Sequence, residues 1–298
     1  MLMGAVSALT VDFRWYKEKN MKSKIEQYLN LDLHPVAIIW SDDKPEKALQ
    51  LKEGKYACAM HLVARAAKGK TAALDAATCG CATAASAFGF GRFEDKWLLG
   101  MDYYYAFLSC GMKDKGIDDE MKELLTAASK QGLAPQNFLH FLLEGEGYKK
   151  SRELVKKHVD SWPIVQIKEK YVVMKPLKEV DEKNETPVQI IFFTNPNQLS
   201  ALITLANCST GKSDMVKVGG GSACQDVGLF AYQESQEASP RAIIGFKDIF
   251  ARNNLKNSIG TDKMTFTVPK KLFMTMEADV DHSLLVRHTW KELSTLKD

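Results

Sequence analysis

The side chains of this sequence best suited to chemistry are its six cysteines. Thiolate sulfur is a ligand of zinc and of iron–sulfur clusters, and it is also a strong nucleophile. Cys79 and Cys81 flank a single glycine, which lets the backbone fold so that both sulfurs face one site. The spacing therefore predicts that these two thiols act together.

Two further cysteines lie where helices are predicted to begin. Cys58 opens an amphipathic stretch, and Cys224 follows Gly219, Gly220 and Gly221. The N–H groups at a helix start favour negative charge, so we expect a lowered pKa for both thiols. The leading hypothesis is a metal-binding protein that holds an iron–sulfur cluster and has a redox role, with zinc as the alternative metal. Its predicted ligands are Cys58, Cys79, Cys81 and Cys224.

Other readings of the same residues stay open. Gly219, Gly220, Gly221 and Ser222 form the predicted cofactor-binding segment, because N–H groups at a helix start cradle anions. The same glycines also fit a flexible helix entry that needs positive φ. A small-ligand binding protein would use this segment together with the tyrosines at 103–105. A thiol enzyme would use Cys58 or Cys224 as its nucleophile, and buried structural cysteines would do no chemistry.

Two further motifs carry less weight. His61 lies three residues after Cys58, where it is either another ligand or a polar group on a core face. Gly211-Lys-Ser213 is similar to a phosphate-binding loop, but Ala206 stands where that loop needs its first glycine. The motif also follows a predicted helix rather than a strand, so we reject a phosphate-binding loop.

The elements that position these residues are read from hydrophobic periodicity and helix-capping signals. Apolar β-branched runs predict strands at 35–40, 171–174, 188–193, 242–246 and 264–268. Helical spacing predicts helices at 44–50, 58–67, 118–130, 135–143, 151–159, 197–206, 222–233, 248–253 and 285–296. Residues 98–108 fit either strand or helix. Alternating strands and helices predict an α/β fold, or a mixed α+β variant, with a central mixed sheet covered by helices.

Length and composition predict one α/β domain over 21–298, with two lobes divided near 178–187 as an option, and a loose extension over 1–20. A net charge of +3 without a basic block argues against nucleic-acid binding. No apolar run is long enough for a membrane span. The absence of a secretory signal predicts a cytoplasmic protein with unpaired cysteines. A redox protein or a small ligand is the expected partner.

Several short motifs together carry a family resemblance. They are Pro35-Val-Ala-Ile-Ile, Cys58-Ala-Met-His-Leu-Val-Ala-Arg65 with Gly69, Asp75, Cys79-Gly-Cys81, Pro176-Leu177, Pro187-Val-Gln-Ile-Ile-Phe-Phe-Thr-Asn-Pro196, Gly220-Gly-Ser-Ala-Cys224 and Val268-Pro269. Over roughly residues 22–276 the chain resembles domain of unknown function family 169, an uncharacterised prokaryotic family. The resemblance places Cys58, Cys224 and one of Cys79 or Cys81 at family cysteine positions. The chain departs from the family near 240–250, and the resemblance implies no particular activity.

Overall fold

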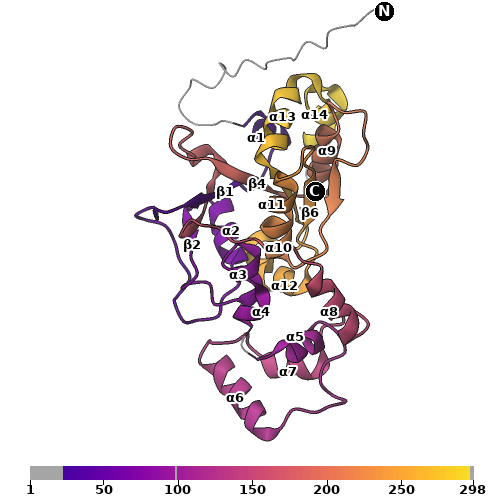
Figure 1. The fold of residues 1–298 in the computed structure, drawn as a ribbon. Helices are drawn as coiled ribbons and strands as arrows, with labels where there is room; N and C mark the ends of the chain where they lie inside the picture. Colours follow the sequence, from indigo (N-terminus) through magenta and orange to yellow (C-terminus); the bar gives the residue numbers. More distant parts are fainter. Residues whose placement is uncertain (1–22, 98, 296–298) are drawn as a thin grey trace, which may run out of the picture.

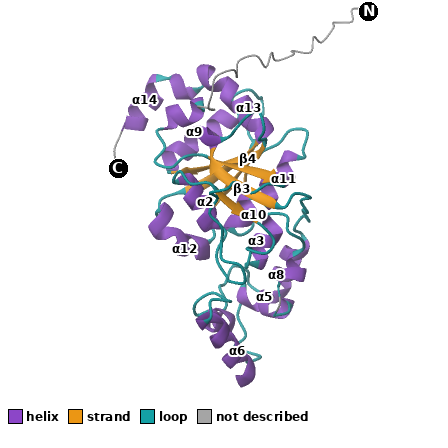
Figure 2. Ribbon diagram, turned by 90° about the vertical axis from the view of Figure 1, so that its left-hand side faces the viewer, coloured by secondary structure: helices purple, strands orange, loops and turns teal. Residues whose placement is uncertain are grey.

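The centre of the fold is a seven-stranded sheet with the order β2-β3-β1-β4-β7-β6-β5 (Figure 2). The computed structural model describes residues 23–97 and 99–295. Strands β5 and β6 pair in parallel, whereas the other neighbouring strands pair antiparallel. The predicted α/β fold with a mixed sheet is thus confirmed. The strands are β1 (Val36–Ser41), β2 (Ala72–Leu74), β3 (Tyr171–Pro176), β4 (Pro187–Thr194), β5 (Val216–Val218), β6 (Ala242–Gly245) and β7 (Met264–Pro269).

Helices cover both faces of the sheet, because its central strands are apolar on both sides. On β4, Ile191 and Phe193 pack into one hydrophobic cluster, while Ile190 and Phe192 pack into the other. Figure 2 shows the two helical layers above and below the strands. One layer contains α1 (Lys24–Leu29), α9 (Pro196–Ala206), α13 (Lys270–Asp279) and α14 (His288–Thr295). The other contains α2 (Met60–Ala67), α3 (Ala82–Ala87), α10 (Ala223–Val227), α11 (Leu229–Ser235) and α12 (Ile249–Ile259).

A helical lobe, residues 93–160, is inserted between β2 and β3 and extends away from the sheet (Figure 1). Its own small core includes Leu125, Phe138 and Leu142. The longest of its helices begins where Asp118 accepts a hydrogen bond from the Met121 N–H and caps the first turn. The lobe contains α4 (Phe93–Lys96), α5 (Met101–Phe107), α6 (Asp119–Lys130), α7 (Phe138–Glu144) and α8 (Arg152–Asp160).

Several predicted boundaries differ from those observed. Residues 44–50 form turns and a β-bridge instead of a helix, and 222–233 is divided into two helices at Gly228. Residues 178–187 lie on the connection between β3 and β4, and the division into two lobes there stays a prediction. The predicted extension 1–20 lies outside the described residues. Within the described ranges, no helix has the length and apolarity needed to cross a bilayer.

Tyr148 connects the helical lobe to the sheet domain. Its hydroxyl donates to an Asp248 oxygen at 3.1 Å and accepts a hydrogen bond from the Phe250 N–H at 3.1 Å. The Phe250 ring also reaches into the lobe, with its centroid 5.5 Å from that of Phe141. The lobe is therefore held against the start of α12 by one hydroxyl and by aromatic contacts.

Removing this hydroxyl is expected to weaken the attachment of the lobe. We expect Tyr148→Phe to lower the free energy of unfolding by about 1.5 kcal/mol, because it removes a hydrogen bond to a carboxylate and leaves the Phe250 N–H without its acceptor. Urea titration followed by tryptophan fluorescence measures the change. Tyr28→Phe is the matched control, because Tyr28 is also about a third exposed (36%) and no hydrogen bond to its hydroxyl is described. Equal stability of the two variants would contradict this role for Tyr148.

Candidate functional site

The four cysteines predicted as ligands pack against a single hydrophobic core cluster on the α2 side of the sheet. Cys224 is buried in that cluster, and Cys58, Cys79 and Cys81 are partly buried against it. This cluster extends over one face of the sheet, so packing against it does not bring the four sulfurs to one site. Cys110 and Cys208, which were not predicted as ligands, are exposed elsewhere.

These thiols are poor sources of thiolate. Burial, and next the proximity of Cys81, raise the pKa of Cys58 from 9.0 to about 12, and the same causes raise the pKa of Cys79 to about 12. Burial also raises the pKa of Cys81 and, most strongly, that of Cys224. The Met60 N–H opposes the shift at Cys58 but does not outweigh desolvation. The expectation that helix starts would lower these pKa values is therefore wrong.

The predicted metal-binding function is also wrong. Across residues 23–97 and 99–295, no group of three or more His, Cys, Asp or Glu side chains is placed to hold a metal ion. Ligand sulfurs must all approach one metal to about 2.3 Å in ionised form. Here Cys58, Cys79, Cys81 and Cys224 are instead distributed around an apolar core and favour the protonated state. An iron–sulfur redox role therefore has no support in the described residues.

The Gly219–Gly221 segment surrounds a buried ion pair. Asp226 is fully buried and accepts hydrogen bonds from the Gly221 N–H and from Lys247 Nζ, each at 3.2 Å. A Cβ at Gly219 would lie 2.0 Å from an Asp226 oxygen, so glycine is needed there for close approach. Lys247 Nζ also donates to the Gly221 carbonyl at 2.7 Å. Hydrogen bonds to the side chains of Asp226 and Lys247 thus hold the glycine segment in place.

The start of α10 has little free capacity for an anion. The Ser222 N–H donates to Gln225 at 2.9 Å, and the Ala223 N–H donates to an Asp248 oxygen at 3.2 Å. An anion bound at the predicted segment Gly219, Gly220, Gly221 and Ser222 would have the carboxylates of Asp226 and Asp248 as neighbours. This geometry favours a structural role for the glycines, and cofactor binding there stays a prediction.

A different region of the described chain contains a cavity of about 580 Å³. Three segments form its walls: the chain leading into α2, the connection between α6 and α7, and α12. The first two walls are joined by the Tyr56 N–H, which donates to the Gly132 carbonyl at 2.9 Å, and by Lys55 Nζ, which donates to the Gln131 carbonyl at 2.8 Å. The lining residues are Tyr56, Ala57, Cys58, His61, Ser129, Lys130, Gly132, Ala134, Pro135, Gln136, Asn137, Phe141, Phe250, Asn253 and Asn254.

The ionisable groups Tyr56, Cys58 and His61 are uncharged in this cavity near neutral pH. Burial lowers the pKa of His61 below 6.5, and the nearby charge of Arg65 lowers it further. Burial raises the pKa of Tyr56 and of Cys58. The cavity therefore presents a neutral imidazole, a phenol and a thiol beside aromatic rings and carboxamide side chains.

The sequence hypotheses did not locate this cavity. Cys58 and His61 are candidates from the sequence for other reasons, and the residues between the predicted helices 118–130 and 135–143 carry no sequence signal of a site. Of the tyrosines at 103–105, Tyr104 is buried in an aromatic cluster with its ring centroid 4.3 Å from that of Phe93, and none of the three lines this cavity or the smaller one near α3 and α4. Only contacts between segments distant in sequence create the cavity, and no local pattern signals it.

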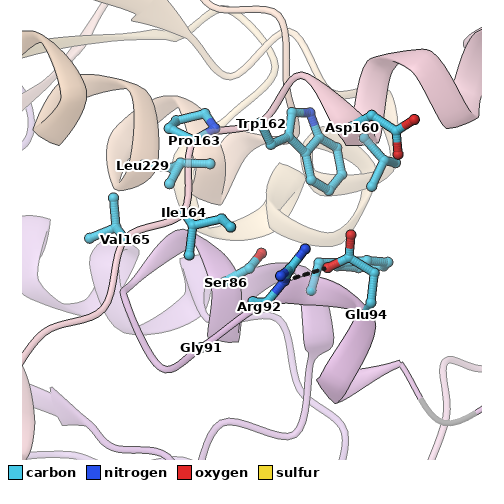
Figure 3. A pocket seen from close by; sticks show the side chains of 12 residues that line it. Ser86, Gly91, Arg92, Glu94, Asp160, Trp162, Pro163, Ile164, Val165 and Leu229 are labelled. Carbon is cyan, nitrogen blue, oxygen red and sulfur yellow. Dashed lines mark ion pairs between the residues drawn. The ribbon is translucent and has the colours of Figure 1, made fainter.

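A second cavity, of about 170 Å³, lies at the junction of α3, α4 and the chain after α8. Figure 3 shows the Trp162 ring on one side and Arg92 and Glu94 on the other. The two charged side chains are 3.8 Å apart and exposed. This cavity is below the usual size of a small-molecule site, and none of the predicted site residues lines it.

The fold and the larger cavity define the class: a three-layer α/β protein with an inserted helical lobe and a cavity between lobe and sheet domain. The chain belongs to domain of unknown function family 169, whose model, described as uncharacterised ArCR, matches residues 24–279. The family resemblance drawn from the sequence is confirmed over nearly the same range. No curated protein and no solved structure matches the chain.

Proposed function

We propose that this protein binds a small organic molecule in the cavity between its helical lobe and its sheet domain. The observation that carries the proposal is the cavity itself, whose volume of about 580 Å³ lies within the range of roughly 300–1,000 Å³ typical of ligand sites. Its position also supports the proposal, because ligand sites occur preferentially between structural units.

The lining provides both apolar contact and hydrogen bonds. The rings of Tyr56, Phe141 and Phe250 offer flat surfaces for an apolar or aromatic body. The carboxamides of Asn253 and Asn254 both donate and accept hydrogen bonds, which orients a polar substituent. The Cys58 thiol is protonated at neutral pH and contributes contact and a weak donor, so the proposal is one of binding and includes no thiol chemistry.

Filling the cavity tests the proposal. Asn254 is exposed on α12 and lines the cavity, so Asn254→Trp is expected to occupy the site without disturbing the core. Saturation-transfer NMR with a set of neutral and charged aromatic fragments should show binding to the unchanged protein and at least tenfold weaker binding to this variant. Asn257→Trp is the matched control, because Asn257 is exposed on the same helix but does not line the cavity. Absence of fragment binding, or equal binding to both variants, would sink the proposal.

We also propose that the protein works in a reducing compartment such as the cytoplasm. All six cysteines are described, and none forms a disulfide. Free thiols of this number are typical of reducing compartments. Fractionation of cells that express the full chain, with immunodetection in each fraction, tests the location.

A further inference from the structure

The described side chains that line the cavity include one positively charged group and no negatively charged group. Its described lining includes amide, hydroxyl, phenol, thiol and ammonium groups but no carboxyl group. The acceptors that remain are neutral amide and hydroxyl oxygens and the imidazole. A cation bound here would find no opposite charge, whereas an anion would find several donors.

Lys130 provides the ammonium group of the cavity lining, and Lys55 lies nearby but outside the lining. Lys130 lines the cavity at the end of α6, and no ion pair of Lys130 is described, although Lys122 on the same helix pairs with Asp119 at 2.7 Å. Lys55 lies close to the end of α6, where its Nζ donates a hydrogen bond to the carbonyl of Gln131, the residue after Lys130, at 2.8 Å. The Lys55 Cδ also lies 3.8 Å from the position of a Cβ on Gly132, which lines the cavity.

A further cation, Arg65, lies on α2, whose first turn lines the cavity through His61. Arg65 lies one turn after His61 on α2, and its positive charge lowers the pKa of the His61 imidazole. Positive charge thus lies on the α6 side at Lys130 and near the α2 side at Arg65. Among the described residues, the one carboxylate whose charge acts on Tyr56 and Cys58, that of Asp248, accepts hydrogen bonds from the Tyr148 hydroxyl and the Ala223 N–H. Lys130 and Arg65 are both exposed, so their effect on the sign of a ligand is strongest at low salt.

We propose that the ligand of this cavity is a small organic monoanion, a carboxylate attached to an aromatic or other flat apolar body. Lys130 binds the carboxylate with a charge-assisted hydrogen bond, and the rings of Phe141 and Phe250 pack against the body. The inference rests on the proposed function, because it names the class of molecule that the same cavity takes.

Three probes that share one ring and differ in charge test this inference. Benzoate, benzamide and benzylammonium are titrated separately into the full chain by ligand-observed NMR at neutral pH and low salt. We expect benzoate to bind on the order of tenfold more tightly than benzamide, and benzylammonium to bind more weakly than either, since one charge-assisted hydrogen bond is worth about one decade in affinity.

Variants of Lys130 assign the preference to its charge. Lys130→Met is expected to lower benzoate affinity about tenfold and to leave benzamide affinity within twofold, because it keeps the length of the side chain and removes its charge. Lys130→Arg should retain the preference for benzoate. Lys291→Met is the matched control, because Lys291 is exposed on α14, outside the cavity.

The outcomes separate this inference from the proposed function. If benzamide binds as tightly as benzoate, or if Lys130→Met leaves benzoate binding unchanged, the anion inference is overturned. In that case, if the probes still bind the unchanged protein and Asn254→Trp still abolishes their binding, the proposed function is retained. Absence of binding by all three probes overturns both.

Discussion

Gly80→Ala is expected to lower the free energy of unfolding by about 2–3 kcal/mol. A Cβ on Gly80 would lie 2.1 Å from the Lys55 carbonyl oxygen and 3.3 Å from the Tyr56 Cα. Both neighbours are backbone atoms, and the Tyr56 N–H is already bonded to the Gly132 carbonyl, so the contact cannot be relieved by rotating a side chain. The glycine between Cys79 and Cys81 is thus needed for close approach of two chain segments.

The same substitution is expected to disturb the cavity, because the displaced segment forms one of its walls. Urea unfolding measures the stability, and the fragment titrations described above measure the site. Gly211→Ala is the matched control, since a Cβ at Gly211 meets no atom within 4 Å and its φ is not in the left-handed region. Equal free energies of unfolding for the two alanine variants would show that the close approach at Gly80 does not contribute to stability.

Asp226→Asn is expected to remove a pH dependence of stability. Burial raises the pKa of Asp226 from 3.8 to about 6, and its interaction with Lys247 opposes the shift only in part. Between pH 4 and pH 6 the folded protein therefore keeps a proton that the unfolded chain releases. The contribution of Asp226 to the free energy of unfolding is fully present below pH 4 and falls by about 3 kcal/mol as the pH rises through this window.

The measurement is the difference between the two proteins at each pH. In urea unfolding from pH 4 to pH 7, the unchanged protein should lose about 3 kcal/mol relative to Asp226→Asn as the pH rises, because only the unchanged protein contains the titrating carboxyl group. Near pH 4 both folded proteins have an uncharged side chain at position 226, and the interaction with Lys247 contributes only as the carboxyl group ionises. Asp42→Asn, at an exposed position, should run parallel to the unchanged protein. Parallel curves for Asp226→Asn would contradict the buried titration.

Strong local patterns predicted most elements of the fold. The apolar run of β4 and the capped amphipathic pattern of α6 are determined by residues close in sequence, and the structure confirms both. The break at Gly228 has a remote cause, because a Cβ there would lie 2.3 Å from the Ala87 carbonyl oxygen of α3. No periodicity within 222–233 contains that information. The missing helix at 44–50 is similar, since Leu49 pairs with Ala72 beside the sheet.

The candidate site was predictable in composition but not in chemistry. The sequence predicted one shared site for Cys58, Cys79, Cys81 and Cys224, whereas all four pack against a large apolar cluster and form no metal-binding group in the described residues. It could not indicate their protonation, because desolvation depends on the whole surrounding fold, whereas a helix start is visible locally. The cavity was missed for the same reason, since its walls come from three distant segments.

The insertion of the helical lobe between β2 and β3 has a consequence for folding kinetics. Pairing of these strands closes a loop from Leu74 to Tyr171, and the entropy cost of closing a loop grows with its length. We expect the sheet to assemble first around β1, β4 and β7, and the edge strand β2 to join late, once the lobe has collapsed. The last step of folding would then be the docking of the lobe and of β2. A molecule bound between the lobe and the sheet would therefore slow unfolding and leave the folding rate nearly unchanged.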